Sequence, residues 1–292
     1  MRNVTLAATQ MSCSWDVEDN LSKAERLVRE AAGRGANIVL IQELFATPYF
    51  CQDQSADFFD IAQPLDGNPI VERFSKLAAE LNVVLPVSYF EQAGKAYFNS
   101  VAIVDAGGAV LGNYRKSHIP DGTGYTEKFY FSPGDTGFRA WKTRFATIGV
   151  GICWDQWYPE AARAMALLGA EILMYPTAIG SEPHDAELDT AAPWQRIMQA
   201  HAVANVMPVI ASNRIGTESL ISPQNGAGQT FYGHSFIANH RGDKVAEFGA
   251  REEGVLVASF DLDYLNTHRA AWGFFRDRRP ELYTALASPR PA

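Results

Sequence analysis

The sequence predicts a layered α/β fold, because short apolar strand segments alternate with amphipathic helical segments along the chain. The first unit shows the pattern: residues 4–9 are apolar and partly β-branched, residues 20–32 repeat apolar side chains at helical spacing, and residues 37–41 are apolar throughout. A continuous apolar strand is typical of a sheet covered on both faces. We therefore expect helices packed against sheets within one domain that spans residues 1–292.

The same order of elements returns in the second half of the chain, which supports a layered fold. A strand at 146–152 is followed by a helix at 158–168 and a strand at 171–175, with Gly169 at the end of the helix. The remaining expected elements are a helix at 194–206, strands at 208–212, 235–238 and 255–261, and hairpin-like runs at 83–90 and 100–104.

The charge balance limits the partners of the protein. The net charge is -8, the isoelectric point is about 5.3, and Lys and Arg do not cluster, so no nucleic-acid partner is expected. The N-terminal residues lack the apolar stretch of a secretory signal, and no later segment is long and apolar enough to cross a bilayer. We expect a cytoplasmic protein that does not bind membranes and acts on a small molecule.

Neither a metal nor a nucleotide cofactor is expected. The histidines are scattered, and Cys13, Cys51 and Cys153 form no CxxC pair and are too few for a disulfide framework. The run GVG at 149–151 starts like a dinucleotide-binding fingerprint, but Trp154 stands where the third glycine should be.

Three residues have the chemistry of a hydrolase site. Cys153 lies between an apolar strand and a helix, where the dipole of the helix N-terminus stabilises a thiolate and an oxyanion. Glu43 ends another apolar strand, where a partly desolvated carboxylate is suited to act as a general base, and Lys116 is a candidate for the cation beside the thiol. Taken singly, each has an ordinary alternative: a thiol that only packs, a strand-end charge that faces water, and a solvated loop cation.

Three motifs follow each other in the order Glu, Lys, Cys: LIQELF at 40–45, YRKSHIP at 114–120 and GICWDQWYPE at 151–160. Together they resemble the nitrilase superfamily of carbon-nitrogen hydrolases, and the similarity continues to RDRRPELY at 276–283. The resemblance implies an αββα sandwich, in which two mixed sheets lie face to face with helices outside. It also implies dimers in which helices of both subunits form a four-layer arrangement, and larger homo-oligomers built from these dimers.

The resemblance assigns a role to each residue. Cys153 would be the nucleophile, Glu43 the general base and then the acid, and Lys116 the cation that stabilises the oxyanion together with the backbone N–H after Cys153. A second glutamate of the family matches Glu127, which would position Lys116, relay protons, or only hold its loop through hydrogen bonds. The resemblance implies no cofactor and no metal.

Within the superfamily, segments 116–122, 124–131 and 179–183 resemble the N-carbamoylputrescine amidohydrolases. The substrate of that group carries a ureido group at one end and an ammonium at the other, so its pocket needs an acidic partner. Glu182 is the candidate for this partner. Tyr49, His118 and Trp154 are expected around the pocket.

Other functions and contacts stay open at this point. A β-ureidopropionase or an ω-amide hydrolase would use the same catalytic residues but bind a substrate carboxylate, for which Arg196 and Arg214 are candidates. A catalytically silent binding module would keep the fold and use the three residues for packing only. The tail at 266–292 mixes aromatic and Arg residues, which suits either a subunit contact or an arm docked on its own subunit.

Overall fold

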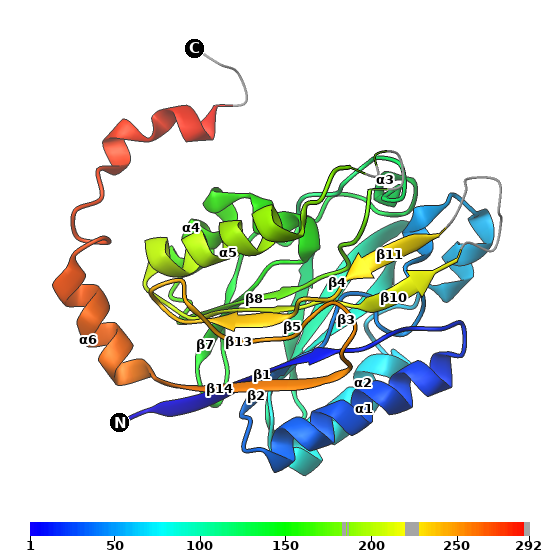
Figure 1. Ribbon diagram of the computed structural model, residues 1–292, viewed down its shortest axis with the longest axis horizontal. Coiled ribbons are helices and arrows are strands. Elements are labelled where there is room, and N and C mark those ends of the chain that lie inside the picture. The colour runs from blue at the N-terminus through cyan, green and yellow to red at the C-terminus, as the bar shows by residue number, and fades with distance from the viewer. Residues whose placement is uncertain (183–184, 186, 220–227, 289–292) are drawn as a thin grey trace.

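The computed structural model describes residues 1–182, 185, 187–219 and 228–288. Figure 1 shows four layers: helices α1 (Val17–Gly33) and α2 (Pro69–Leu81) lie on one side, two sheets lie in the middle, and helices α4 (Pro159–Leu167) and α5 (Ala191–Asn205) lie on the other side. The αββα sandwich expected from the sequence is confirmed. Pro183, the last residue of the segments that carry the narrower resemblance, lies outside the described residues.

One sheet carries the strand that leads to Cys153. Its strands are ordered β13-β12-β9-β8-β7-β6, and β7, β8 and β9 run parallel in its centre. Parallel strands in this position are covered on both faces, which explains their continuous apolar sequences. The bounds are β6 Ala140–Lys142, β7 Thr147–Val150, β8 Ile172–Pro176, β9 Val209–Ser212, β12 Phe236–Ala238 and β13 Lys244–Glu247.

The other sheet carries the strands that lead to Glu43 and Lys116. Its two pieces, β14-β1-β2 and β3-β4-β5, are joined by a bridge between Ile38 and Val84, so the strands follow each other across the whole layer. A separate antiparallel pair is formed by β10 and β11. The bounds are β1 Asn3–Gln10, β2 Ile38–Leu40, β3 Leu85–Ala93, β4 Ala96–Val104, β5 Val110–Arg115, β10 Ile215–Glu218, β11 Gln229–Tyr232 and β14 Gly254–Asp261.

Apolar cores fill the spaces between the layers. Leu40 and Ile148 belong to the core between the two sheets, Phe74 to the core beneath α1 and α2, and Trp194 to the core beneath α5. These four side chains are fully buried. Because interiors packed in this way transmit strain and resist displacement, the strand ends that carry the candidate catalytic residues start from rigid elements.

The expected helices and strands are present, with ends shifted by a few residues, but several elements were missed. The clearest omission is α2, which starts after Asn68, whose side chain accepts hydrogen bonds from the N–H groups of Ile70 (3.0 Å) and Val71 (3.1 Å). Pro69 follows at the first helical position, where its fixed φ suits the helix, so the Asn-Pro pair was a readable start signal. The short strands β6, β10, β11 and β13 were also missed, because a strand this short does not show a clear alternation of apolar and polar residues.

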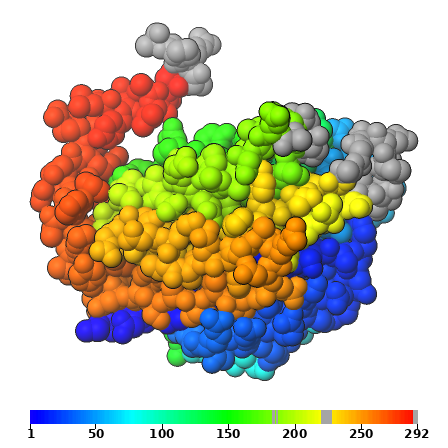
Figure 2. Space-filling model, in the orientation of Figure 1, coloured from blue at the N-terminus to red at the C-terminus, as the bar shows by residue number. Residues whose placement is uncertain are grey.

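After β14 the chain continues through α6 (Leu262–Trp272) into a segment that we name the arm, residues 273–288. Its short 3-10 helices are Pro280–Leu282 and Thr284–Ala287. Figures 1 and 2 show the arm leaving the body of the molecule and curving round on the side of α4 and α5. Residues 289–292 of the predicted tail lie outside the described part of the chain.

Candidate active site

The three candidate catalytic residues follow the ends of three strands. Glu43 comes after β2, Lys116 directly after β5, and Cys153 shortly after β7, so two of them come from one sheet and the third from the other. The N–H of Glu43 donates to the carbonyl oxygen of Thr177, which follows β8 in the sheet of Cys153, at 3.4 Å. The strand ends of the two face-to-face sheets therefore meet at this site.

Lys116 lies at the centre of a buried hydrogen-bonded cluster. Its Nζ donates to Glu43 Oε1 at 2.9 Å and to both carboxylate oxygens of Glu127, at 2.8 and 2.7 Å. The side chains of all three residues are 0% exposed. The alternatives of a solvated loop cation at Lys116 and of a water-facing carboxylate at Glu43 are therefore excluded.

Burial and charge oppose each other in this cluster. Burial alone would lower the pKa of Lys116, but the carboxylates of Glu127 and Glu43 and the thiolate form of Cys153 outweigh it and hold the pKa well above its ordinary value. Burial raises the pKa of Glu127 to about 7, although Lys116 acts in the opposite direction. The lysine is therefore a permanent cation, whereas Glu127 exchanges a proton near neutral pH.

Cys153 sits at a sharp turn of the backbone. Its φ is 42°, in the left-handed region that residues other than glycine rarely adopt, and Leu44, next to Glu43, has a φ of 47°. The thiol contacts the carbonyl oxygen of Ala178 at 3.7 Å. Burial raises the pKa of Cys153 well above its ordinary value, Glu43 raises it further, and Lys116 lowers it. The thiol is therefore protonated in the free protein and needs a base at the moment of attack.

The cluster supplies the groups that such an attack requires. Oε2 of Glu43 has no hydrogen-bond partner among the described residues, so it is an acceptor that remains available for a proton. Lys116 is a buried, fixed cation, which stabilises a negative oxygen far more in a dry site than in water. The arrangement can therefore deprotonate a thiol and stabilise an oxyanion.

A pocket of about 650 Å³ opens beside Cys153. Two carboxylates, Asp121 and Glu182, line it, and no Lys, Arg or His stands among its described lining residues. Aromatic side chains form much of the remaining wall; Tyr125, Trp154 and Trp157 are lining residues. The apolar side chains of the wall suit an aliphatic chain, and the two carboxylates suit a positive charge at its end. The pocket therefore fits a short aliphatic cation.

Of the four predicted pocket residues, Glu182 and Trp154 line the pocket, whereas Tyr49 and His118 do not. Tyr49 is fully buried, and its hydroxyl donates to Glu127 Oε1 at 2.6 Å, because its ring points into the catalytic cluster. His118 is turned toward Asp155, with its Nδ1 2.7 Å from Asp155 Oδ1. The structure thus directs these two side chains toward Glu127 and Asp155, and their contact with a substrate stays a prediction.

The two arginines considered for a substrate carboxylate do not lie at the pocket. Arg196 is exposed on α5. Arg214 is fully buried in an ion pair with Glu218 at 2.7 Å, and it donates to the carbonyl oxygens of Glu43 (2.7 Å) and Leu44 (3.2 Å). Arg214 therefore supports the backbone of the candidate base, and neither arginine supplies a carboxylate site.

Asn99 belongs to the cluster and was missed from the sequence. Its Nδ2 donates to Glu43 Oε1 at 2.7 Å, from a fully buried position within β4. Asparagine is depleted in strands, so a buried Asn in an apolar strand was the signal that pointed to it.

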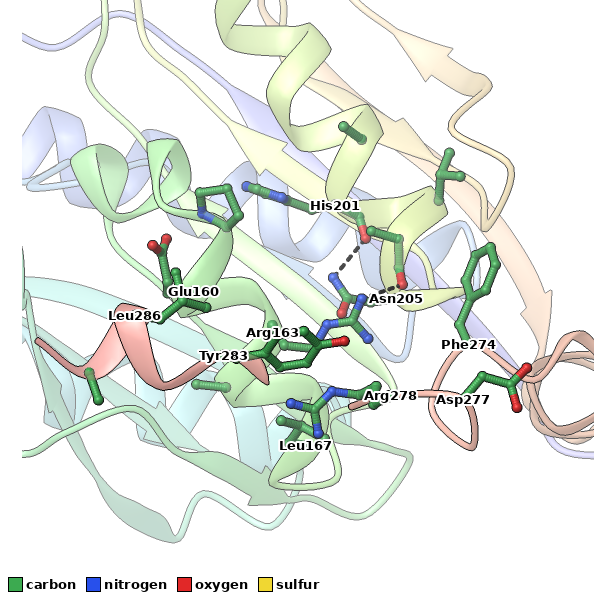
Figure 3. A pocket seen from close by; sticks show the side chains of 16 residues that line it. Glu160, Arg163, Leu167, His201, Asn205, Phe274, Asp277, Arg278, Tyr283 and Leu286 are labelled. Atoms are coloured by element: carbon green, nitrogen blue, oxygen red, sulfur yellow. Dashed lines mark hydrogen bonds between the residues drawn. The ribbon is translucent and has the colours of Figure 1, made fainter. Parts of the chain in front are cut away.

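A larger hollow of about 1330 Å³ lies away from this chemistry, between the arm and helices α4 and α5. Figure 3 shows Arg163 and Leu167 of α4 opposite Phe274, Arg278 and Tyr283 of the arm. Neither Cys153 nor any other residue of the catalytic cluster lines it. The hollow is therefore a feature of the surface of the subunit, distinct from the pocket beside Cys153.

Within the described residues, no group of His, Cys, Asp and Glu side chains is arranged to hold a metal ion. In the same part of the chain, none of the helices combines the length and the hydropathy of a membrane span. The three cysteines are free thiols.

Comparison with known proteins places the chain in a family. It matches the model described as "Carbon-nitrogen hydrolase" over residues 5–270. The protein therefore belongs to the carbon-nitrogen hydrolases of the nitrilase superfamily, and it is a hydrolase of carbon-nitrogen bonds other than peptide bonds. The resemblance stated from the three motifs is confirmed.

Individual relatives are similar over nearly the whole chain. This chain is 61% identical to a protein of Oryza sativa subsp. japonica named "N-carbamoylputrescine amidase", and the match covers 97% of this chain and 94% of that protein. It is 52% identical to a "Citrullinase" of Francisella tularensis, over 98% and 99% of the two chains. The crystal structure of a carbon-nitrogen hydrolase from Helicobacter pylori G27 has a TM-score of 0.93 at 38% identity and covers 99% of this chain and 100% of that chain.

Proposed function

We propose that the protein hydrolyses N-carbamoylputrescine to putrescine, carbon dioxide and ammonia, and so serves polyamine biosynthesis. The observation that carries the proposal is the charge of the pocket beside Cys153, which Asp121 and Glu182 line without a Lys, Arg or His among the described lining residues. Such a wall attracts a substrate that ends in an ammonium and repels one that ends in a carboxylate. The similarity to the rice N-carbamoylputrescine amidase supports the same substrate.

In the first half of the reaction, Cys153 attacks the ureido carbon. Its proton passes to Glu43, a new sulfur-carbon bond forms, and the carbonyl oxygen becomes an oxyanion. Lys116 and the backbone N–H that follows Cys153 stabilise this oxyanion. Glu43 then gives the proton to one nitrogen, the carbon-nitrogen bond breaks, and an amine product leaves a covalent intermediate on the sulfur.

In the second half, water replaces the amine. Glu43 takes a proton from the water as its oxygen attacks the same carbon, and the sulfur leaves as the thiolate and recovers a proton. The carbamic acid released in this route decomposes to carbon dioxide and an amine. Glu127 and Tyr49 do not touch the reacting atoms in this scheme: Tyr49 holds Glu127, and Glu127 holds the ammonium of Lys116.

The substrate is tested by measuring kcat/KM for ammonia release from N-carbamoylputrescine, N-carbamoyl-β-alanine and citrulline. We expect the first to be preferred by about 100-fold or more, because unfavourable charge contacts cost several kcal/mol. Cys153→Ala should abolish turnover, and Cys13→Ala serves as the matched control. A preference for either carboxylate-bearing compound would overturn the substrate, and turnover by Cys153→Ala would overturn the nucleophile. An absence of turnover with all three would overturn the proposed substrate.

We further propose that the protein forms dimers through α4, α5 and the arm, and larger homo-oligomers from these dimers. The hollow between these elements supports the proposal, since Leu167 and Leu286 line it while being 48% and 68% exposed. A second copy of the chain would cover them with its own α4, α5 and arm. Sedimentation analysis of Leu167→Asp should give a smaller particle than the unmodified protein, and an unchanged size would contradict this interface.

We also propose that the protein acts in the cytoplasm with its thiols reduced, which agrees with the three free cysteines. Fractionation of cells that produce the protein, followed by thiol labelling, tests this proposal. Oxidised cysteines in an extracytoplasmic fraction would contradict it.

A further inference from the structure

Asp155 connects the segment of Lys116 to the turn that carries Cys153. Its Oδ2 accepts hydrogen bonds from the N–H of Ile152 at 2.9 Å and from the hydroxyl of Tyr114 at 2.7 Å. Its Oδ1 accepts from the N–H of His118 at 3.0 Å and lies 2.7 Å from Nδ1 of the same residue. One fully buried carboxylate thus binds both flanks of Lys116 and the residue before Cys153.

The partners of Asp155 are themselves held in place. The ring of His118 stacks on Tyr158, with 3.6 Å between ring centroids and an angle of 6° between the ring planes. The hydroxyl oxygen of Tyr114 lies 2.9 Å from Ser117 Oγ and accepts a hydrogen bond from the N–H of Ser117 at 3.3 Å, so its own proton is free for Asp155. An ionised carboxylate only accepts hydrogen bonds, and all its contacts here are with groups that can donate. In this network Asp155 is therefore always the acceptor, and its partners hold it in one position.

We propose that Asp155 is a positioning residue, which sets the place of Lys116 relative to Cys153 and thereby the reactivity of the thiol. The inference rests on Cys153 being the nucleophile of the proposed function. Asp155 is absent from the described lining of the pocket, so it acts through the two other residues. The connection matters because Lys116 and Cys153 come from different sheets, and an error of about 1 Å in such a pair can cost about 100-fold in rate.

The test is the rate at which iodoacetamide alkylates Cys153, followed by peptide mass spectrometry over a range of pH. In Asp155→Asn one carboxylate oxygen becomes an amide N–H₂, which cannot accept a hydrogen bond. It then faces either the donors of His118 or those of Ile152 and Tyr114, so these hydrogen bonds are lost. We expect the alkylation rate to fall roughly 10- to 100-fold. The pH profile should move to higher pH, because a displaced Lys116 no longer lowers the pKa of the thiol.

Glu171 provides the matched control. It is a carboxylate that accepts a hydrogen bond from the N–H of Thr147, at 3.0 Å, at the opposite end of the strand that leads to Cys153. Glu171→Gln should lower the melting temperature without moving the pH profile of alkylation. If Asp155 had a purely structural role, Asp155→Asn would likewise lower the melting temperature and leave the pH profile of alkylation unchanged.

Tyr114→Phe tests the same network with a smaller change, because it removes one hydrogen bond to Asp155 and keeps the ring. It should shift the pH profile in the same direction by a smaller amount. The proposal is overturned if the folded variants, Tyr114→Phe included, alkylate Cys153 with the wild-type rate and pH profile. A wild-type Cys153 that reacts no faster than Cys13 and Cys51 would instead overturn the proposed nucleophile, so the two failures are distinguishable.

Discussion

Lys116 Nζ donates to both carboxylate oxygens of Glu127, at 2.8 and 2.7 Å, and neither side chain is exposed. Glu43 accepts a third hydrogen bond from the same ammonium at 2.9 Å. One buried cation therefore faces two buried carboxylates. The pKa of Cys153 is raised by burial and by Glu43, although Lys116 lowers it.

Loss of the cation should impair both catalysis and folding. In Lys116→Met we expect kcat to fall by at least about 100- to 1000-fold, as for the removal of one oxyanion donor. The free energy of unfolding should fall by about 3–5 kcal/mol, because two carboxylates are left buried without their partner. Steady-state kinetics and urea denaturation measure the two effects. Lys128→Met, at an exposed lysine next to Glu127 in the short helix Glu127–Tyr130, should change neither. Wild-type kcat in Lys116→Met would refute the role of the cation.

Tyr49 should affect turnover and leave substrate binding unchanged. Tyr49→Phe removes the 2.6 Å hydrogen bond to Glu127 and keeps the ring. We expect kcat to fall about tenfold, since hydrogen bonds to charged groups contribute about 1.5–3 kcal/mol. KM should stay within about twofold of the wild-type value, because Tyr49 does not line the pocket. A rise in KM with unchanged kcat would restore Tyr49 to the pocket wall.

Substitution of Glu182 should change substrate binding and leave turnover nearly unchanged. In Glu182→Gln we expect KM for N-carbamoylputrescine to rise about 10- to 100-fold, because a charge-assisted hydrogen bond to the far ammonium is lost. The value of kcat should change little, since Glu182 is proposed to bind the ammonium end of the substrate and not the ureido group that reacts. Glu187→Gln, at an exposed glutamate that does not line the pocket, is the control. An unchanged KM in Glu182→Gln would mean that another group binds the ammonium of the substrate, and Asp121 would then be the candidate.

Glu127 should give stability a pH dependence of defined sign. Its pKa is raised by burial to about 7 from an ordinary value of 4.5, so the folded protein favours the protonated form. This contribution to stability is complete below about pH 4.5 and is lost as the pH rises through about 7. The free energy of unfolding of the wild type, relative to Glu127→Gln, should therefore fall across this window. Denaturation at a series of pH values measures the difference, and a constant or rising difference would contradict the assignment.

Much of the fold was predictable because the signals are local. The apolar runs before Glu43 and Cys153 predicted buried strands, and the helical spacing at 20–32 predicted α1. Helix α2 was missed, although Asn68 and Pro69 mark its start. In each case the information lies within a few neighbouring residues.

The sequence singled out Glu43, Lys116 and Glu127, which the structure brings into one cluster, but it did not predict the contacts among them. Lys116 stands in a polar stretch that suggests solvent, and its burial results from carboxylates that other segments of the chain supply. The hydrogen bond between Tyr49 and Glu127 joins residues 78 positions apart. No local pattern encodes such a pair, so Tyr49 and His118 were expected at the pocket wall while their side chains serve Glu127 and Asp155.

The most direct test of Cys153 as the nucleophile is to mix the protein with N-carbamoylputrescine, quench the mixture in acid within one turnover, and locate any covalent adduct by peptide mass spectrometry. We expect an acyl adduct on Cys153, absent from Cys13 and Cys51 and from the Cys153→Ala protein. Ammonia release without any adduct on Cys153, or an adduct on a different residue, would contradict this role of Cys153.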